Sequence, residues 1–203
     1  MIAGVGAPGL IVLSSEQREA LVTAAVEEPL EWVQHNKLMQ LGPWLATLES
    51  RQQERLLTVI GDRFPDSPRV ITEPIIAMSA GLGTLNPTLQ KALVKLAVDL
   101  ECGSDKAEAL ASLGGGLKAL EPLQKQVLVD AARNLSKGQQ DDRGWCGATS
   151  IVRLAAGWAA LTLKQQQELL DSALGLYQDK NKAMAITGII SGYLASMVPG
   201  DLR

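Results

Sequence analysis

Aromatic residues, histidine and cysteine are all scarce in this chain of 203 residues. Aromatic residues make up 3% of it, beside one histidine and two cysteines. So few aromatic residues disfavour a β-sandwich or β-barrel, whose strands are rich in aromatic and β-branched residues. Cys102 and Cys146 form no C-x-x-C pair, so the sequence predicts neither a zinc site nor a disulfide framework. Two free thiols are typical of a reducing compartment such as the cytoplasm.

The residues that acid–base or nucleophilic catalysis requires are also few. With His35 as the only histidine, neither a Cys–His nor a Ser–His–Asp arrangement is recognisable. The adjacent carboxylates Glu27/Glu28 and Asp141/Asp142 would not face one substrate from a helix, so we interpret them as solvated. No metal-ligand spacing, dinucleotide fingerprint or Walker motif occurs. The sequence therefore predicts a protein that is not an enzyme and binds no cofactor or metal.

A large excess of one charge and a long apolar run are likewise absent. The formal net charge of −3 argues against a general binder of polyanions. The apolar run from Ala183 to Val198 contains two glycines and a tyrosine, and it is shorter than the roughly 20 residues of a membrane-spanning helix. The first residues lack the basic region of a secretory signal. We therefore expect a soluble protein.

A five-residue phrase, in most copies beginning with glycine, recurs along the chain. It reads GLIVL, WLATL, GLGTL, GLKAL, GWAAL and, in a weaker form, GYLAS. Its second residues are Leu10, Leu45, Leu82, Leu117, Trp158 and Tyr193, at successive spacings of 35, 37, 35, 41 and 35 residues. Such a near-constant period is the signature of a repeat architecture.

The residues after each phrase predict an amphipathic helix. Counted from the last leucine of the phrase, offset 8 is always leucine, offset 9 is apolar, and offset 12 is alanine or isoleucine. These offsets share one face of a helix, and a strand does not produce the set. Helix-start signals follow the same leucine, because capping residues stand at the N-cap, proline at N1 and glutamine at N3. They are Ser14, Asn86 and Thr162; Pro87 and Pro122; and Gln17, Gln52, Gln124 and Gln165.

Another helix is expected before each phrase. We expect these helices to begin near Pro29, Pro74, Ser104, Thr149 and Asn181. Small residues, mostly glycine, recur at their ends. Since glycine in a helix costs about 0.5–1 kcal/mol relative to alanine, this recurrence predicts the close approach of a neighbouring helix. Residues 61–74, with three prolines, and residues 136–147 are expected to be loops.

These patterns predict an all-α fold, a short right-handed α-solenoid of about five helix–turn–helix repeats of 35–41 residues. One domain would span residues 1–203, with units at 1–27, 28–65, 70–101, 104–136 and 148–177 and a half unit at 181–198. The first and last units are incomplete and apolar. We therefore expect either a portion of a longer repeat protein or self-association through the apolar terminal helices.

The period, the paired helices and the L-x7-L-L/V-x2-A pattern resemble HEAT- and armadillo-like α-solenoids from about Leu10 to Ser196. The leucine- and glutamine-rich style also resembles helical repeats of large effectors secreted by plant-associated bacteria, which would place the protein in a host cytoplasm. One unit, ALASLGGGLKALEPLQ, is similar to the DNA-reading repeats of transcription activator-like effectors. Thr47, Gly83 and Ala160 depart from that pattern in other units, so no base-reading residue is inferred.

The outward face of the helices that follow each phrase is polar at offsets 6 and 10. Its charge changes from Glu19 and Glu54 to Lys91 and Lys95 along the array. Nucleic-acid binding would require a continuous basic track with aromatic residues for stacking. A protein–protein interaction scaffold is therefore the predicted function, and a nucleic-acid-binding repeat is the alternative.

Aromatic and arginine side chains are the usual anchors of protein interfaces. Two tryptophans within the phrase, Trp44 and Trp158, are expected in the core. The candidate partner-binding residues come from the two expected loops and the outward stripe: Arg63, Phe64, Arg69, Arg143, Trp145, Lys91 and Lys95.

Overall fold

A computed structural model describes residues 13–63, 68–101, 103–137 and 141–197. These residues form ten α-helices and four short 3-10 helices without any strand, which confirms the predicted all-α class. The α-helices are α1 (Ser15–Val26), α2 (Glu31–Leu41), α3 (Ser50–Arg63), α4 (Pro68–Ser79), α5 (Pro87–Asp99), α6 (Gly103–Gly114), α7 (Pro122–Ser136), α8 (Asp141–Ala155), α9 (Leu163–Leu174) and α10 (Asp179–Met197). The 3-10 helices are η2 (Gly42–Thr47), η3 (Leu82–Thr84), η4 (Leu117–Ala119) and η5 (Trp158–Ala160).

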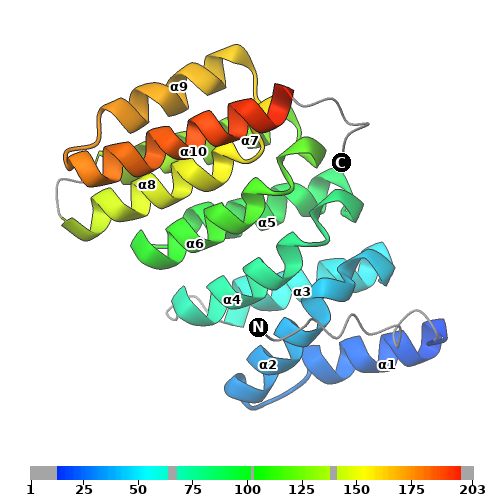
Figure 1. The fold of residues 1–203 in the computed structure, drawn as a ribbon. Helices are drawn as coiled ribbons and strands as arrows, with labels where there is room; N and C mark the ends of the chain where they lie inside the picture. The colour runs from blue at the N-terminus through cyan, green and yellow to red at the C-terminus, as the bar shows by residue number, and fades with distance from the viewer. Residues whose placement is uncertain (1–12, 64–67, 102, 138–140, 198–203) are drawn as a thin grey trace, which may run out of the picture.

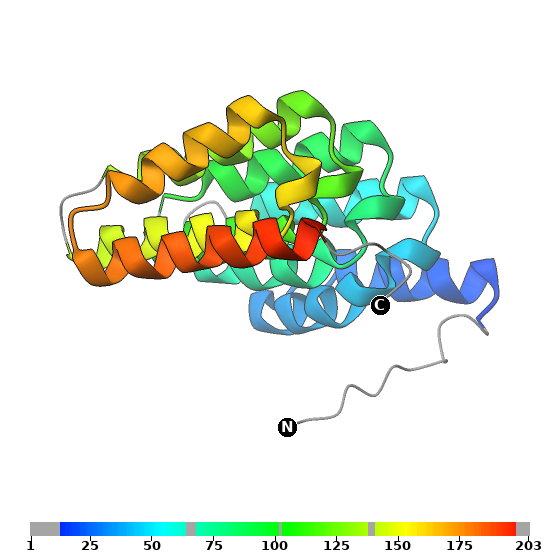
Figure 2. The same ribbon diagram turned by 45° about the horizontal axis from the view of Figure 1, so that its top comes forward.

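The helices lie in two layers. Contacts join α2, α4, α6, α8 and α10 in sequence within one layer, and α1, α3, α5, α7 and α9 within the other. Figures 1 and 2 show this order, with α1 and α2 at one end of the molecule and α9 and α10 at the opposite end. Helices of both layers contribute apolar side chains to one continuous core.

The apolar face predicted for the odd-numbered helices forms much of this core. The offset-8 leucines of α3, α5, α7 and α9 are fully buried: Leu56, Leu93, Leu128 and Leu169. Leu21 of α1 was expected to be equivalent, but its side chain is 44% exposed. The reason is its position, because within the described residues α1 packs mainly against α2 and α3, whereas α3, α5, α7 and α9 each pack against three or more helices.

Each recurring phrase that the structure describes, apart from the last, folds as a 3-10 turn. The closing leucine of the turn is buried and extended, with ψ between 143° and 150°, and the next helix begins shortly after it. The predicted N-cap interactions are present, since Ser14 accepts from the Gln17 N–H and Thr162 from the Gln165 N–H. The last phrase differs, because residues 192–196 remain within α10. Trp44 and Trp158 are half-buried, not part of the fully buried core that we expected.

Among the recurring glycines, Gly192 permits close packing as predicted and Gly115 does not, because no atom lies within 4 Å of its Cβ position; the neighbouring Gly114 also lies at a close contact. A Cβ atom on Gly114 of α6 would lie 2.4 Å from the carbonyl oxygen of Arg153 in α8. A Cβ on Gly192 of α10 would lie 1.9 Å from the Ala155 carbonyl oxygen, also in α8. Both distances are far shorter than a van der Waals contact, so alanine would force these helices apart.

Two segments expected to be loops are mostly helical. Within residues 61–74, α3 continues to Arg63 and α4 begins at Pro68, so helix α4 does not start at Pro74 but contains it. Proline at the first position of a helix removes no hydrogen bond, and the buried Ile71, Ile75 and Met78 stabilise the helix around Pro74. Similarly, α8 begins at Asp141, eight residues before the predicted start at Thr149, so most of the expected second loop belongs to α8.

None of the described helices combines the length and the apolar character needed to cross a bilayer.

Candidate functional site

The described candidate residues from the two expected loops lie in helices. Arg63 ends α3 and Arg69 lies in the first turn of α4, while Arg143 and Trp145 lie in the first turns of α8. Trp145 is thus helical, not part of a loop, and its side chain is 52% exposed. Phe64 lies outside the described residues, as do the side-chain environments of the three arginines.

Lys91 and Lys95 line a groove of about 530 Å³ between α5 and α7, called here the α5–α7 groove. Its apolar lining comes from Val94 and Val98 on α5 and from Leu123 and Val127 on α7. Leu123 is 71% exposed and Val127 is 37% exposed, so apolar surface remains open to solvent there. Asp99 and Glu121 complete the charged lining.

Two other pairs of neighbouring odd-numbered helices, α1–α3 and α7–α9, are bridged by polar side chains at a repeated position, whereas α3–α5 has Ala92 opposite Glu54 and lacks the bridge. The offset-6 residue of one helix meets the offset-7 residue of the next. Between α1 and α3, Arg55 donates to the carboxylate of Glu19. Between α7 and α9, the amide of Gln126 donates to Glu168 Oε2 at 2.7 Å. The polar side chains span the space between α1 and α3 and between α7 and α9. These pairs have no glycine contact like the one between Gly114 of α6 and the backbone of α8.

The polar bridge is absent between α5 and α7. The offset-6 residue of α5 is Lys91, and the offset-7 residue of α7 is Val127, which cannot accept a hydrogen bond. Lys91 is exposed and makes no hydrogen bond or ion pair with the described part of the chain. A cation without a partner in the described part of the chain therefore stands beside apolar side chains at the position where α1–α3 and α7–α9 have a closed polar contact.

The second candidate cation of this groove is already paired. Lys95 Nζ lies 2.7 Å from Asp99 Oδ2, one turn further along α5. The hydrogen bond to Asp99 and the charge of that carboxylate raise the pKa of Lys95. Lys91 and Lys95 consequently differ in their capacity to bind a ligand anion, although the sequence pattern treats them alike.

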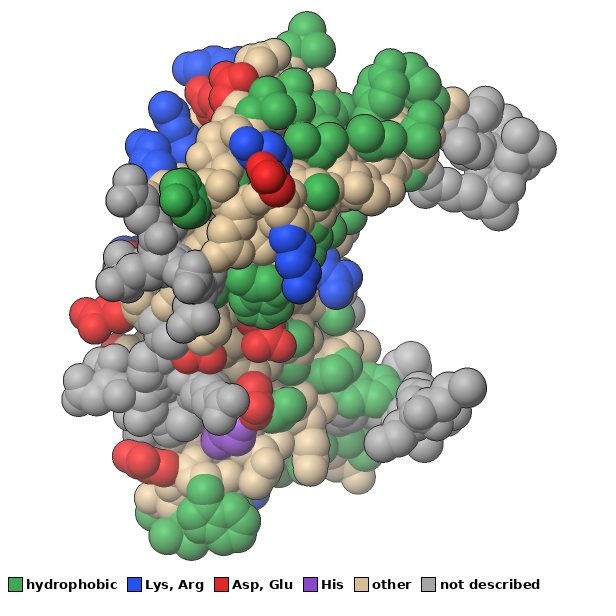
Figure 3. Space-filling model, turned by 60° about the vertical axis from the view of Figure 1, so that its left-hand side comes forward, with side chains coloured by type: hydrophobic (Ala, Val, Ile, Leu, Met, Phe, Trp, Pro, Cys, Tyr) green, Lys and Arg blue, Asp and Glu red, His purple; other side chains and the backbone are tan. Residues whose placement is uncertain are grey.

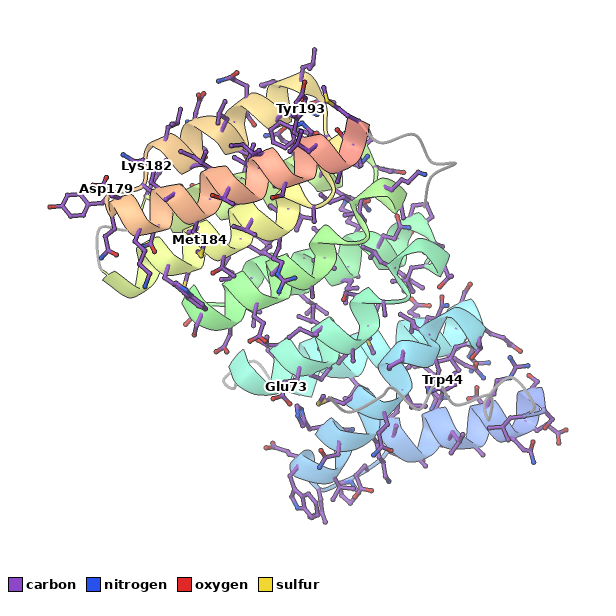
Figure 4. The ribbon with its side chains drawn as sticks, in the orientation of Figure 1. Trp44, Glu73, Asp179, Lys182, Met184 and Tyr193 are labelled. Atoms are coloured by element: carbon purple, nitrogen blue, oxygen red, sulfur yellow. The ribbon has the colours of Figure 1, made fainter. Side chains whose placement is uncertain are left out.

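A second groove, of about 650 Å³, lies between α8 and α10. Most of its lining residues are small, and Met184 and Arg153 are its largest side chains. Figure 4 shows Met184 on α10 facing the region of α8. Arg153 is exposed beside Val152 and Met184 in this groove, and its side chain, like that of Lys91, makes no hydrogen bond or ion pair within the described part of the chain.

Exposed apolar side chains also gather at the two ends of the array (Figure 3). On α10, Ile190, Leu194 and Met197 are each more than half exposed, and Tyr193 is 45% exposed (Figure 4). At the other end, the side chain of Trp32 on α2 is 69% exposed. These surfaces agree with the apolar character expected for the terminal helices, and they contribute no convergent polar groups.

Several titratable side chains of the described region form pairs that join helices or turns. His35 Nε2 lies 2.7 Å from Glu73 Oε2, which joins α2 to α4 (Figure 4). The hydrogen bond from Lys37 lowers the pKa of Glu28, and the hydrogen bond from Gln52 lowers that of Glu19. Among the described residues, no group of three or more histidine, cysteine, aspartate or glutamate side chains is placed to hold a metal ion.

Sequence reasoning missed two sets of residues that shape this surface. The first set is the glutamine directly after the N3 position. Gln53 and Gln90 each donate to backbone carbonyl oxygens of the 3-10 turn that precedes their helix and of its closing leucine. Leu123 and Val127 of the groove are the other. A comparison of offsets 6 and 7 across neighbouring units would have found Val127 opposite Lys91, one of the two positions where an apolar residue replaces the polar partner.

Comparison with protein-family models, with curated proteins and with solved structures found no match to this chain.

Proposed function

We propose that this protein is an α-solenoid of helix–turn–helix repeats that acts as a protein–protein interaction scaffold. One unit would comprise an even-numbered helix, a 3-10 turn and the following odd-numbered helix, as in η3 between α4 and α5. Recurring contacts between units support this interpretation. Gln124 of α7 donates to the Pro87 carbonyl oxygen of α5, and Gln165 of α9 donates to the Pro122 carbonyl oxygen of α7. Stacked repeats of this kind present extended surfaces to partners.

The α5–α7 groove is the observation on which the interaction role rests. Protein interfaces combine desolvated apolar surface with a polar or charged rim. The groove has both, because Val94, Val98, Leu123 and Val127 lie between charged side chains. Leu123 and Val127 would lose solvent-exposed apolar area on binding, which is favourable by about 25 cal/mol per Å². A polypeptide segment with apolar side chains fits this groove.

Site-specific photo-crosslinking in cells that produce the protein would test the proposal. A photo-reactive amino acid is introduced in place of Leu123 in the intact chain. We expect a discrete polypeptide adduct that survives nuclease treatment, because the side chain at this position points into the groove lining. The adduct should disappear when an excess of the unmodified protein competes for the partner.

Leu163 provides the matched control. It is 84% exposed in the first turn of α9 and does not line the groove. The same photo-reactive residue at this position should give no corresponding adduct. Equal adducts from both positions, or none from the groove position, would count against an interaction scaffold, and a nuclease-sensitive adduct would favour nucleic-acid binding instead.

A further inference from the structure

We infer that the partner of the α5–α7 groove is an acidic amphipathic peptide segment, with a carboxylate beside apolar side chains. This inference rests on the proposed scaffold function and adds the chemical class of the partner. Lys91 lines the groove and is an offset-6 residue without a polar partner at offset 7 of the next odd-numbered helix.

The two closed bridges show what Lys91 would meet in a closed contact, whereas Glu54, like Lys91, has an apolar residue opposite it, Ala92. Where offset 6 is Gln126, offset 7 of the next helix is Glu168, and where offset 6 is Glu19, it is Arg55. Each pair combines a charged side chain with one of complementary hydrogen-bonding character. Opposite Lys91 stands Val127, so the complementary carboxylate is not supplied by the described part of the chain.

A ligand that covers the groove must compensate the charge of Lys91. Binding over Val127 and Leu123 removes water from the neighbouring ammonium group, and a desolvated charge without a partner is costly. A carboxylate on the ligand would satisfy it, whereas a cationic segment or a neutral one would not. The charge of Lys91 thus selects against most apolar peptides and in favour of acidic ones.

The other charged groups of the groove define where the ligand carboxylate would lie. Lys95 is already paired with Asp99, so it adds little attraction. Glu121 lies at the N-cap of α7 and would repel a carboxylate placed at that end. The ligand carboxylate should therefore lie near Lys91 in the middle of the groove.

The apolar groups set the spacing of the ligand's own side chains. Val94 and Val98 are one helical turn apart on α5, and Leu123 and Val127 are one turn apart on α7. Apolar ligand residues at i and i+4 of a helix would repeat at the same interval. The expected occupant is accordingly a short helical segment with apolar residues one turn apart and an aspartate or glutamate beside them.

Selection from a displayed library of short random peptides on the intact, folded chain would test this inference. Peptides enriched on the wild-type protein should contain aspartate or glutamate next to leucine, isoleucine, valine or phenylalanine. The V127E variant should bind them about tenfold more weakly or worse, because it introduces at offset 7 the carboxylate that Lys91 lacks and closes the groove. The K91E variant should instead enrich peptides with lysine or arginine in place of the acidic residue.

Two controls keep these outcomes separate from unfolding and from binding elsewhere. K91E alters an exposed side chain and should not change the melting temperature, so it remains informative if V127E destabilises α7. L163E, outside the groove, should bind the selected peptides as well as the wild type does.

The negative results are distinguishable. Enriched peptides without acidic residues, or peptides whose binding is insensitive to both V127E and K91E, would overturn the acidic-peptide inference but leave the scaffold function standing. Tight binding of a single-stranded oligonucleotide with no enrichment of any peptide would overturn both.

Discussion

At the scale of single residues, a shift of two positions along a helix separates a core residue from a surface residue. Leu93 and Lys91 lie two residues apart in α5, yet Leu93 is fully buried and Lys91 is exposed. The burial follows from the helical period, because the side chains at the two positions point about 200° apart around the axis, at about 100° per residue. Their contributions to the free energy of unfolding should differ accordingly.

We expect Leu93→Ala, or Leu128→Ala in α7, to lower the free energy of unfolding by about 2–5 kcal/mol, because each leaves a cavity in a packed core. Lys91→Ala should change it by no more than about 0.5 kcal/mol, as exposed substitutions do. Urea titration followed by circular dichroism measures both. Similar losses at the two positions would show that the assigned face of α5 is wrong.

At the scale of helices, different interactions join neighbouring helices within each of the two layers. The even-numbered helices approach closely at glycine, as Gly114 does against the Arg153 carbonyl, whereas two pairs of odd-numbered helices, α1–α3 and α7–α9, are joined by long polar side chains such as Arg55 and Glu19. Close backbone contact excludes larger residues by steric overlap, while polar bridges depend on charge. Each layer therefore has its own characteristic test.

Gly114→Ala should destabilise the protein by about 1–3 kcal/mol, because its new Cβ would lie 2.4 Å from the Arg153 carbonyl oxygen and force α6 from α8. Gly115→Ala is the matched control, since no atom lies within 4 Å of its Cβ position and its φ is not positive. That variant should be neutral or stabilising by about 0.4–1 kcal/mol, through a less flexible unfolded chain. Thermal melts would compare the two, and equal destabilisation would contradict the close-contact explanation.

The α1–α3 bridge predicts a pH effect. The hydrogen bond from Gln52, with the nearby charge of Arg55, lowers the pKa of Glu19 in the folded protein below its ordinary value of 4.5. A lowered folded pKa stabilises the protein above the unfolded pKa, and this stabilisation is lost as the pH falls through the folded value. Glu19→Gln should therefore lose less stability than the wild type between pH 7 and acid pH.

The matched control is Glu54→Gln, at the same offset of α3. Glu54 has Ala92 opposite it and makes no ion pair within the described residues. Chemical denaturation at a series of pH values should show an altered slope for Glu19→Gln and an unaltered one for Glu54→Gln. Identical pH profiles for the wild type and Glu19→Gln would refute the proposed role of the bridge.

At the scale of the whole molecule, packing is not uniform along the array. Helices α6 and α8 are buried between neighbours and contact one another through Gly114, whereas α1 contributes only Val22 and Ala25 to the buried core. Because contacts run mainly between neighbouring helices, local opening of one end does not require the middle to open.

Hydrogen exchange should therefore be slowest for amides of α6 and α8 and fastest for those of α1 and α2. Mass spectrometry of deuterated peptides under native conditions measures this gradient. A single rate of exchange for all ten described helices would show one cooperative unit, and it would argue against a repeat array whose stability is the sum of local interfaces.

The sequence alone determined the all-α class, the buried face of α3, α5, α7 and α9, and the helix caps at Ser14, Asn86 and Thr162. The spacing of Leu56, Leu93, Leu128 and Leu169 predicted which positions are buried, because helical periodicity is a local property of the chain. Glycine recurrence predicted close helix contact for the same reason, since its conformational cost is local and requires compensation. The three prolines of residues 61–74 led to the wrong prediction of a loop. Helix α4 includes Pro74, because the burial of Ile71 and Ile75 outweighs the hydrogen bond lost at this proline.

Only the tertiary structure decided which polar residues meet across helices. The sequence placed Lys91 and Lys95 on one stripe, but whether each has a partner depends on residues in neighbouring elements and in the next turn, such as Val127 and Asp99. Likewise, the exposure of Trp145 on a helix and of Leu21 on α1 depends on which neighbouring helices pack there. Periodicity states which way a side chain points along its own helix. What it meets is set by the packing of another helix, about 35 residues further along the chain.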